Sequence, residues 1–177
     1  MGTQPAIEAN DVWIVDPEYS TARFIIRGPF SLKVEGRFEE MSGTITRNRS
    51  DVTKSRVEAS IRSASLQTGN SRRDGRLKSV EWLAASSVPE ISFKSIEVER
   101  RDRDTLLVTG ILTLRGVSRK LSLDVIEVDR STSPRGQELA YYAVRAKLDR
   151  FDFGLKRSRW RVGRQVEVAI NIQAIKC

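Results

Sequence analysis

Apolar and polar residues alternate with a period of two along many short stretches of this chain. In the clearest stretch, 166–174, the residues on one side are all apolar: Val166, Val168, Ile170, Ile172 and Ala174. Most of the residues between them are polar, which is the pattern of a β-strand with one face buried. The stretches 57–62, 91–96 and 142–148 alternate in the same way. Each of them is therefore predicted to be a strand.

Further strands are expected in shorter or less regular runs, at 13–15, 22–27, 33–38, 43–46, 106–114 and 120–128. Glycine, serine, proline and charged clusters separate these runs. The segments 98–104 and 129–137 are predicted to be hairpin loops. So many strands with few helical signals indicate a mainly β protein, either an antiparallel barrel or a sandwich. A closed barrel would leave no exposed strand edges.

One segment has the pattern of a helix. Asp74 is placed to cap its N-terminus, and Leu77, Val80 and Leu83 are spaced to face inward. Pro89 follows shortly after its expected end. We therefore predict a single short helix, or at most two, beside the strands.

Length and residue types limit the kinds of protein that this chain can be. A chain of 177 residues is expected to form one domain, and we assign 1–11 to an N-terminal tail and 12–177 to the domain. The chain has no histidine, and its single cysteine is the last residue, Cys177. A histidine-based triad, a cysteine-based metal site and an internal disulfide are therefore excluded. We expect neither a metal nor a cofactor.

The charge and the N-terminus bear on partners and location. The net charge is +8 and the pI is about 10.1, which favours anionic partners or serves solubility. The first residues lack a basic region followed by an apolar run, and no apolar run approaches the ~20 residues of a membrane span. We expect a cytoplasmic protein, or a periplasmic one if a signal segment has been removed.

The most distinctive motif is S-L-Q-T-G-N-S-R-R-D-G-R-L-K-S at 65–79. It resembles the signature S-[IL]-x-T-x-N-x-x-R-D-x-x-L-[RK]-S of the YceI-like family. The family's other motifs are matched in the same order at 13–24, 34–43, 89–95, 110–120 and 151–168. Each match alone is weak, but together they extend over nearly the whole chain. One departure is Arg27-Gly28, where many family members have an Arg-His pair.

The resemblance implies a lipocalin-like barrel that holds an elongated apolar chain, a polyisoprenoid or the tail of an isoprenoid quinone, in an internal tunnel. It also implies a non-catalytic protein that sequesters or transports this ligand, in a family whose members are commonly dimeric. Alternation alone cannot distinguish such a tunnel from a filled core, although a barrel of about eight strands can hold one small ligand. Burial would stabilise an isoprenoid by about 0.8 kcal/mol per methylene.

Candidate ligand-binding residues are of two kinds. The apolar candidates lie on the inner faces of the predicted elements: Phe24, Ile26, Phe38, Ile61, Leu77, Leu83, Phe93, Leu112, Leu114, Tyr142 and Phe153. The polar candidates, Arg73 and Asp74, match the family's Arg-Asp pair and could hold a head group. Alternatively, they could anchor the loop before the helix.

The segment 156–164 is the most basic part of the chain, with five cations, no acid and Trp160 among them. It could contact a phosphate, a carboxylate, an anionic membrane surface or nucleic acid, or it could be a solvated loop. Two other functions remain open at this point. An enzyme acting on an isoprenoid or quinone would depend on tyrosine or carboxylate groups. A nucleic-acid-binding barrel would lack any established motif, so we do not expect nucleic acid as a partner.

Overall fold

The computed structural model describes residues 9–157 and 162–177. This part of the chain contains eleven strands, one α-helix and three 3-10 turns. No helix among the described residues is long and apolar enough to cross a membrane. The strands are β1 (Asn10–Val15), β2 (Thr21–Arg27), β3 (Lys33–Phe38), β4 (Met41–Asn48), β5 (Arg56–Arg62), β6 (Leu66–Gln67), β7 (Glu90–Arg100), β8 (Thr105–Leu114), β9 (Val117–Thr132), β10 (Glu138–Asp149) and β11 (Gln165–Lys176). The helix is α1 (Ser71–Lys78), and the turns are η1 (Val52–Lys54), η2 (Ser63–Ser65) and η3 (Arg150–Phe153).

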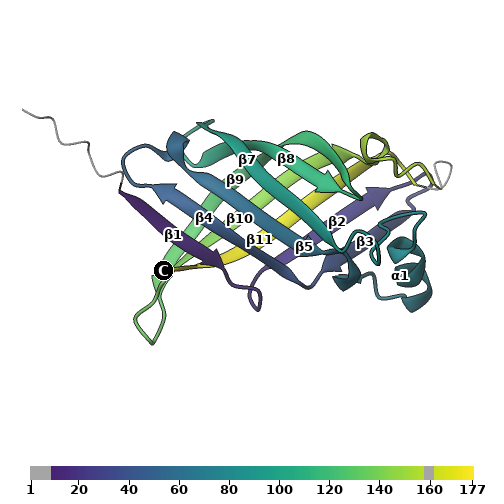
Figure 1. Ribbon diagram of the computed structural model, residues 1–177, viewed down its shortest axis with the longest axis horizontal. Helices are drawn as coiled ribbons and strands as arrows, with labels where there is room; N and C mark the ends of the chain where they lie inside the picture. Colours follow the sequence, from purple (N-terminus) through teal and green to yellow (C-terminus); the bar gives the residue numbers. More distant parts are fainter. Residues whose placement is uncertain (1–8, 158–161) are drawn as a thin grey trace, which may run out of the picture.

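Eight of the strands form a closed antiparallel barrel in the order β1-β4-β5-β7-β8-β9-β10-β11. Pairing of β1 with β11 closes the ring, with Ile14 opposite Ile175. The prediction of a mainly β barrel of about eight strands is therefore confirmed. The three remaining strands, β2, β3 and β6, extend the sheet from the other part of β11 toward α1 (Figure 1).

The alternating residues of each strand point to the inner and the outer face of the barrel in turn. On β2, Phe24 and Ile26 are buried, whereas Arg23 before them and Arg27 after them are exposed. The side chains of successive strand residues point to opposite faces, so the inner residues of all strands meet inside the barrel. At one end of the barrel, Trp13 packs in a buried cluster with residues of β10 and β11.

Two strands are longer than predicted. β7 continues to Arg100 and β9 continues to Thr132, so the expected loops at 98–104 and 129–137 are shorter than proposed. Val98 is buried inside the barrel. Glu97 and Glu99 are exposed, whereas Arg100 follows Val98 on the inner face of the barrel. All three pair with β8, so these charged residues do not mark the end of the strand.

The expectations for the helix were partly wrong. Its N-cap is Asn70, whose side chain accepts from the backbone N–H of Arg73, and Asp74 lies inside the helix.

Val80 follows the helix and is 71% exposed, while Leu83 is buried in the turn beyond the helix. The chain turns back after Lys78, where the N–H groups of Leu83 and Ala85 donate to Leu77 and Lys78. This turn, rather than helical spacing, brings Leu83 to the core.

Candidate ligand-binding cavity

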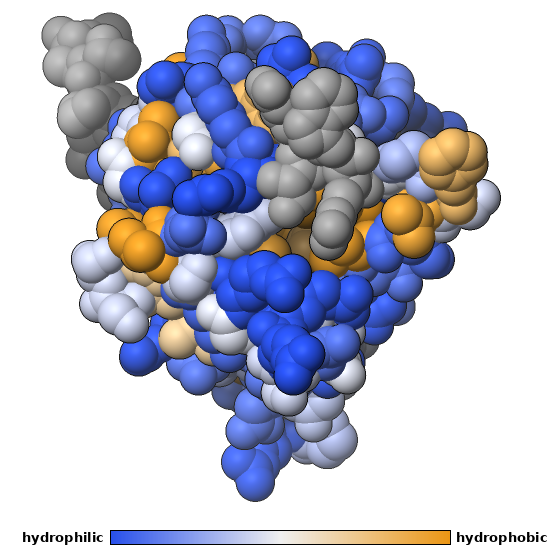
Figure 2. All heavy atoms as spheres, turned by 90° about the vertical axis from the view of Figure 1, so that its right-hand side faces the viewer, coloured by the Kyte–Doolittle hydropathy of each residue, from blue (hydrophilic) through white to orange (hydrophobic). Residues whose placement is uncertain are grey.

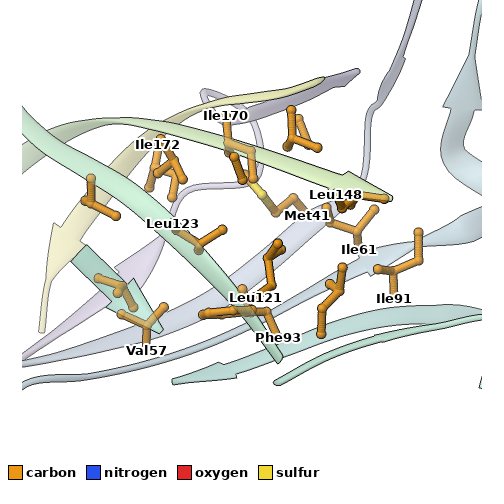
Figure 3. Close-up of a pocket in the computed structure, with 18 of the residues that line it drawn as sticks. Met41, Val57, Ile61, Ile91, Phe93, Leu121, Leu123, Leu148, Ile170 and Ile172 are labelled. Carbon is orange, nitrogen blue, oxygen red and sulfur yellow. The ribbon is translucent and has the colours of Figure 1, made fainter. Parts of the chain in front are cut away.

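The barrel encloses a cavity of about 520 Å³ with mostly apolar lining. The cavity extends from the α1 end, where Leu83 and Leu155 line it, to the β7–β8 hairpin, where Arg103 lines it. These two elements lie at opposite ends of the molecule (Figure 1). Figure 3 shows aliphatic and aromatic side chains from several strands directed into the same space: Met41, Val57, Ile61, Ile91, Phe93, Leu121, Leu123, Leu148, Ile170 and Ile172.

Most of the apolar candidates from the sequence line this cavity. They are Phe24, Ile26, Phe38, Ile61, Leu77, Leu83, Phe93, Leu112, Leu114 and Tyr142. Phe153 is buried in the core cluster that contains Phe24 and Leu83, but it is not itself among the lining residues. Arg73 and Asp74 do not line the cavity either. Contact of any of these residues with a ligand remains a prediction.

Two glycines help to keep the interior open. Gly36 lies opposite Phe24 on the paired strand, and a Cβ at Gly36 would come within 2.5 Å of the Phe24 ring. A Cβ at Gly110 would come within 2.5 Å of the Phe93 ring and 2.4 Å of the Lys94 carbonyl oxygen. Both phenylalanine rings therefore lie against the barrel wall, in the space that a side chain would otherwise fill.

The wall is not hydrogen-bonded along its full length. Pairing of β9 with β10 runs from the Glu138–Thr132 pair to the Arg145–Asp124 pair and stops there. Toward the α1 end, β9 keeps its pairing with β8, and β10 keeps its pairing with β11. Leu121 and Leu148 lie beyond the last pair and point into the cavity from the two separated strands (Figure 3).

Polar groups at the hairpin end form a small charged cluster. Arg47 Nη1 donates to Glu127 at 2.7 Å, and Arg130 also contacts Glu127. Tyr142 lies opposite Glu127 in the strand register, and burial, with Glu127 adding to it, raises the pKa of the tyrosine hydroxyl. The tyrosine is therefore neutral at physiological pH and can donate a hydrogen bond.

Two further arginines line the cavity at this end. Arg100 and Arg103 belong to the β7–β8 hairpin, and Arg100 Nη1 donates to the backbone carbonyl of Arg103 at 3.1 Å. Among the described residues, neither arginine has a carboxylate partner. The hairpin end of the cavity therefore has two cationic side chains that form no ion pair within the described part of the chain, although Asp104 also lines this end.

The α1 end contains one fully buried cation, Arg150, which sequence reasoning missed. Its side chain is 0% exposed and lines the cavity. Among the described residues, the guanidinium donates to four backbone carbonyls, those of Leu155, Arg157, Val162 and Gly163. It also lies 5.4 Å from the centre of the Trp82 ring, a cation–π contact. Burial lowers the pKa of Arg150, but an arginine remains charged in a protein.

Arg73 and Asp74 anchor the loop before α1. The buried Asp74 carboxylate accepts from the backbone N–H and the hydroxyl of Thr68. Arg73 Nε donates to the Thr68 hydroxyl at 3.0 Å, and Arg73 Nη2 donates to the Thr68 carbonyl at 3.0 Å. Both residues therefore hold Thr68, which is the anchoring alternative considered from the sequence.

The basic segment 156–164 is described only in part, since residues 158–161, including Trp160, lie outside the described residues. Its described arginines form surface ion pairs, Arg157 with Glu81 at 2.7 Å and Arg164 with Asp149 at 2.6 Å. In the described part of the chain, no three acidic or cysteine side chains lie close enough together to hold a metal ion.

A closed antiparallel barrel of eight strands around a long apolar cavity is the architecture of lipocalin-like binding proteins. Within this class, the chain belongs to the YceI-like domain family, whose model matches residues 13–174. Protein YceI of Escherichia coli is 27% identical over 141 residues, which cover 80% of this chain and 73% of the relative.

Solved structures agree with this assignment. The Campylobacter jejuni YCEI protein is 25% identical and superposes with a TM-score of 0.73, over 80% of this chain and 84% of that one. A polyisoprenoid binding domain from Saccharophagus degradans has a TM-score of 0.69 over 93% of this chain and 98% of that one. It is only 14% identical, so the likeness concerns the fold.

Proposed function

We propose that this protein binds an elongated apolar lipid, a polyisoprenoid or an isoprenoid quinone, inside the barrel, and that it sequesters or carries this ligand without changing it chemically. The observation that carries the proposal is the cavity of about 520 Å³, which extends between the two ends of the barrel and is lined mainly by aliphatic and aromatic side chains. Such a space matches a ligand that is long, branched and almost free of polar atoms.

The energetics favour a ligand of this kind. Each methylene moved from water into the cavity contributes about 0.8 kcal/mol, so affinity grows with the length of the buried chain. Polar ligands would lose hydrogen bonds to water without replacing them along the apolar wall. The binding of a polyisoprenoid by the S. degradans domain, a protein of the same fold, supports the same class of ligand.

We place the head group at the hairpin end of the cavity. Arg100 and Arg103 supply donors there without carboxylate partners among the described residues, and the neutral Tyr142 hydroxyl lies in the lining. A phosphate or a quinone carbonyl is an acceptor and suits these donors. At the α1 end, by contrast, the donors of Arg150 are already used by four backbone carbonyls.

Organic extraction of the purified protein followed by mass spectrometry tests the proposal. We expect a prenyl lipid to be extracted from the wild type and its mass to be unchanged after incubation with the protein. Leu112→Asp should abolish retention, because it places a charge in the cavity wall. Val128→Asp is the matched control, since Val128 is exposed on β9. Equal lipid retention by Leu112→Asp and the wild type would contradict the proposal.

A further inference from the structure

The turn between β2 and β3 presents apolar side chains directly to solvent. Phe30 is 98% exposed and Leu32 is 55% exposed. The turn is closed by two backbone hydrogen bonds, from Gly28 N–H to Leu32 O at 2.7 Å and from Leu32 N–H to Pro29 O at 3.2 Å. The phenyl ring therefore stands on a hydrogen-bonded turn and is not part of the core.

The backbone of this turn is strained. Phe30 and Ser31 have φ values of 56° and 62°, in the left-handed region that residues other than glycine rarely adopt. Two consecutive residues of this kind, one of them aromatic, are unfavourable for folding. An almost fully exposed phenyl ring adds a further cost in water. Phe30 does not line the cavity, so the strained turn and its exposed ring do not contribute to the ligand site.

Basic residues of α1 lie at the same end of the molecule. The β2–β3 turn and α1 both lie at the right-hand end in Figure 1. On α1, Arg72 and Arg76 are exposed, and neither they nor Lys78 forms an ion pair with any described carboxylate. The acid of this helix, Asp74, is buried. Figure 2 looks onto this end and shows hydrophobic groups that stand out from a largely hydrophilic surface.

From these observations we infer that the α1 end is a docking surface for an anionic lipid bilayer, with Phe30 and Leu32 inserting among the head groups and the α1 cations contacting lipid phosphates. A tight turn is convex and small, which suits insertion into a bilayer better than the broad complementary patch of a protein interface. Cations near the surface of an anionic membrane add to the attraction. This surface goes beyond ligand binding and would bring the cavity of the proposed carrier close to its lipid source.

Co-sedimentation of the full-length protein with vesicles tests this inference. We compare phosphatidylcholine vesicles with vesicles that contain about one third phosphatidylglycerol. The wild type should bind the anionic vesicles, and Phe30→Ser should weaken this binding about tenfold or more, because burial of a phenyl ring is lost. Tyr19→Ser is the matched control, since Tyr19 is an exposed aromatic residue in the β1–β2 turn, and it should bind as the wild type does.

Two further variants separate docking from a structural role. Phe30→Gly should raise the melting temperature by about 2–4 °C, because glycine relieves the strained φ, and should still lose vesicle binding. Neutralising Arg72, Arg76 and Lys78 together to Gln should weaken binding to anionic vesicles only, and added salt should reduce the difference.

The inference is overturned if wild type and Phe30→Ser bind anionic vesicles equally, if the wild type binds neither vesicle type, or if Tyr19→Ser loses as much binding. A wild-type dimer that Phe30→Ser converts to a monomer in sedimentation velocity would assign the turn to a second copy of the chain instead. Extraction of bound lipid from Phe30→Ser should match the wild type, so failure of docking is distinguishable from failure of the proposed function.

Discussion

The two ends of the barrel pair the backbone groups of their irregular segments in different ways. At the hairpin end, the turns are closed locally: Asp102 accepts from the backbone N–H groups of Asp104 and Thr105, and Asn48 accepts from those of Ser50 and Asp51. At the α1 end, arginine side chains donate to the backbone carbonyls of irregular segments. Arg115 donates to the carbonyls of Val80 and Gly154, and Arg150 donates to four carbonyls between 155 and 163.

The difference follows from where the strand pairing stops. Hydrogen-bonded strand pairs continue to the hairpin end. Only the residues of short turns there have backbone groups that need a partner outside the sheet. At the α1 end, β9 and β10 have separated, and irregular segments cover the opening. Buried backbone carbonyls must still be paired, and long arginine side chains supply the missing donors. The α1 end therefore depends on a few individual side chains, whereas the hairpin end depends mainly on regular pairing.

Arg150→Met should give the largest effect on stability. It leaves four carbonyls without their donors and removes the contact with Trp82, so we expect a loss on the order of 3 kcal/mol in the free energy of unfolding. Urea denaturation measures this loss. Arg164→Met, which removes the ion pair with Asp149 and a contact with the Phe151 ring from an exposed side chain, should cost less than about 1 kcal/mol. Similar losses in the two variants would show that Arg150 does not organise this end.

A second test compares two polar residues at the start of α1. Asp74→Ala should cost about 2 kcal/mol, because a buried carboxylate and both of its bonds to Thr68 are lost. Asn70→Ala should cost about 1 kcal/mol, the usual effect of losing an exposed N-cap. Thermal and urea unfolding of both variants check the order. A larger loss in Asn70→Ala would mean that capping, and not the bond to Thr68, holds the helix in place.

A third test asks which end binds the head group. Arg103→Ser should weaken binding of a prenyl phosphate about fivefold, the equivalent of roughly 1 kcal/mol, and should leave the uncharged prenol unaffected. Arg76→Ser removes an exposed cation from the opposite end and serves as the control. Fluorescence titration gives both affinities. If Arg76→Ser weakens phosphate binding and Arg103→Ser does not, the head group lies at the α1 end.

The smallest expected effect is the pH dependence of the Asp149–Arg164 pair. The hydrogen bond from Arg164 holds the pKa of Asp149 below its ordinary value. The pair therefore stabilises the fold above the unfolded pKa of about 3.9, and this contribution disappears as the pH falls through the lower folded pKa. The stability difference between wild type and Arg164→Gln should be below about 1 kcal/mol at neutral pH and should vanish in acid. A difference that persists at pH values below the folded pKa would exclude this explanation.

The sequence predicted most of the barrel because the relevant signal is local. Alternation along 166–174 or 57–62 needs only neighbouring residues to distinguish an inner from an outer face, and β3 was predicted with its observed ends. The ends of other strands were less accurate. The charged run 98–104 predicts a loop, but only 101–104 connect the strands, and 98–100 belong to β7.

The sequence also predicted some residues of the candidate site and missed others. Ten apolar candidates line the cavity because inward-facing positions on a closed barrel necessarily share one interior. Sequence reasoning missed Trp82 and Arg150, which line the α1 end of the cavity. Arginine is seldom fully buried, so an isolated arginine at the end of a strand is ordinarily assigned to the surface. Its role becomes visible only when the four carbonyls around it are known.

By itself, then, the sequence determined the positions of most strands and the strand side chains that face inward, because these depend on periodicity between near neighbours, while the family motifs implied the closed barrel. Only the tertiary structure decided that the interior is a cavity and not a filled core, since that depends on Phe24 and Phe93 lying over glycines of adjacent strands. It also decided the chemistry of the two ends. Arg150 and Arg115 find their partners through contacts between segments up to 39 residues apart, which no local pattern records.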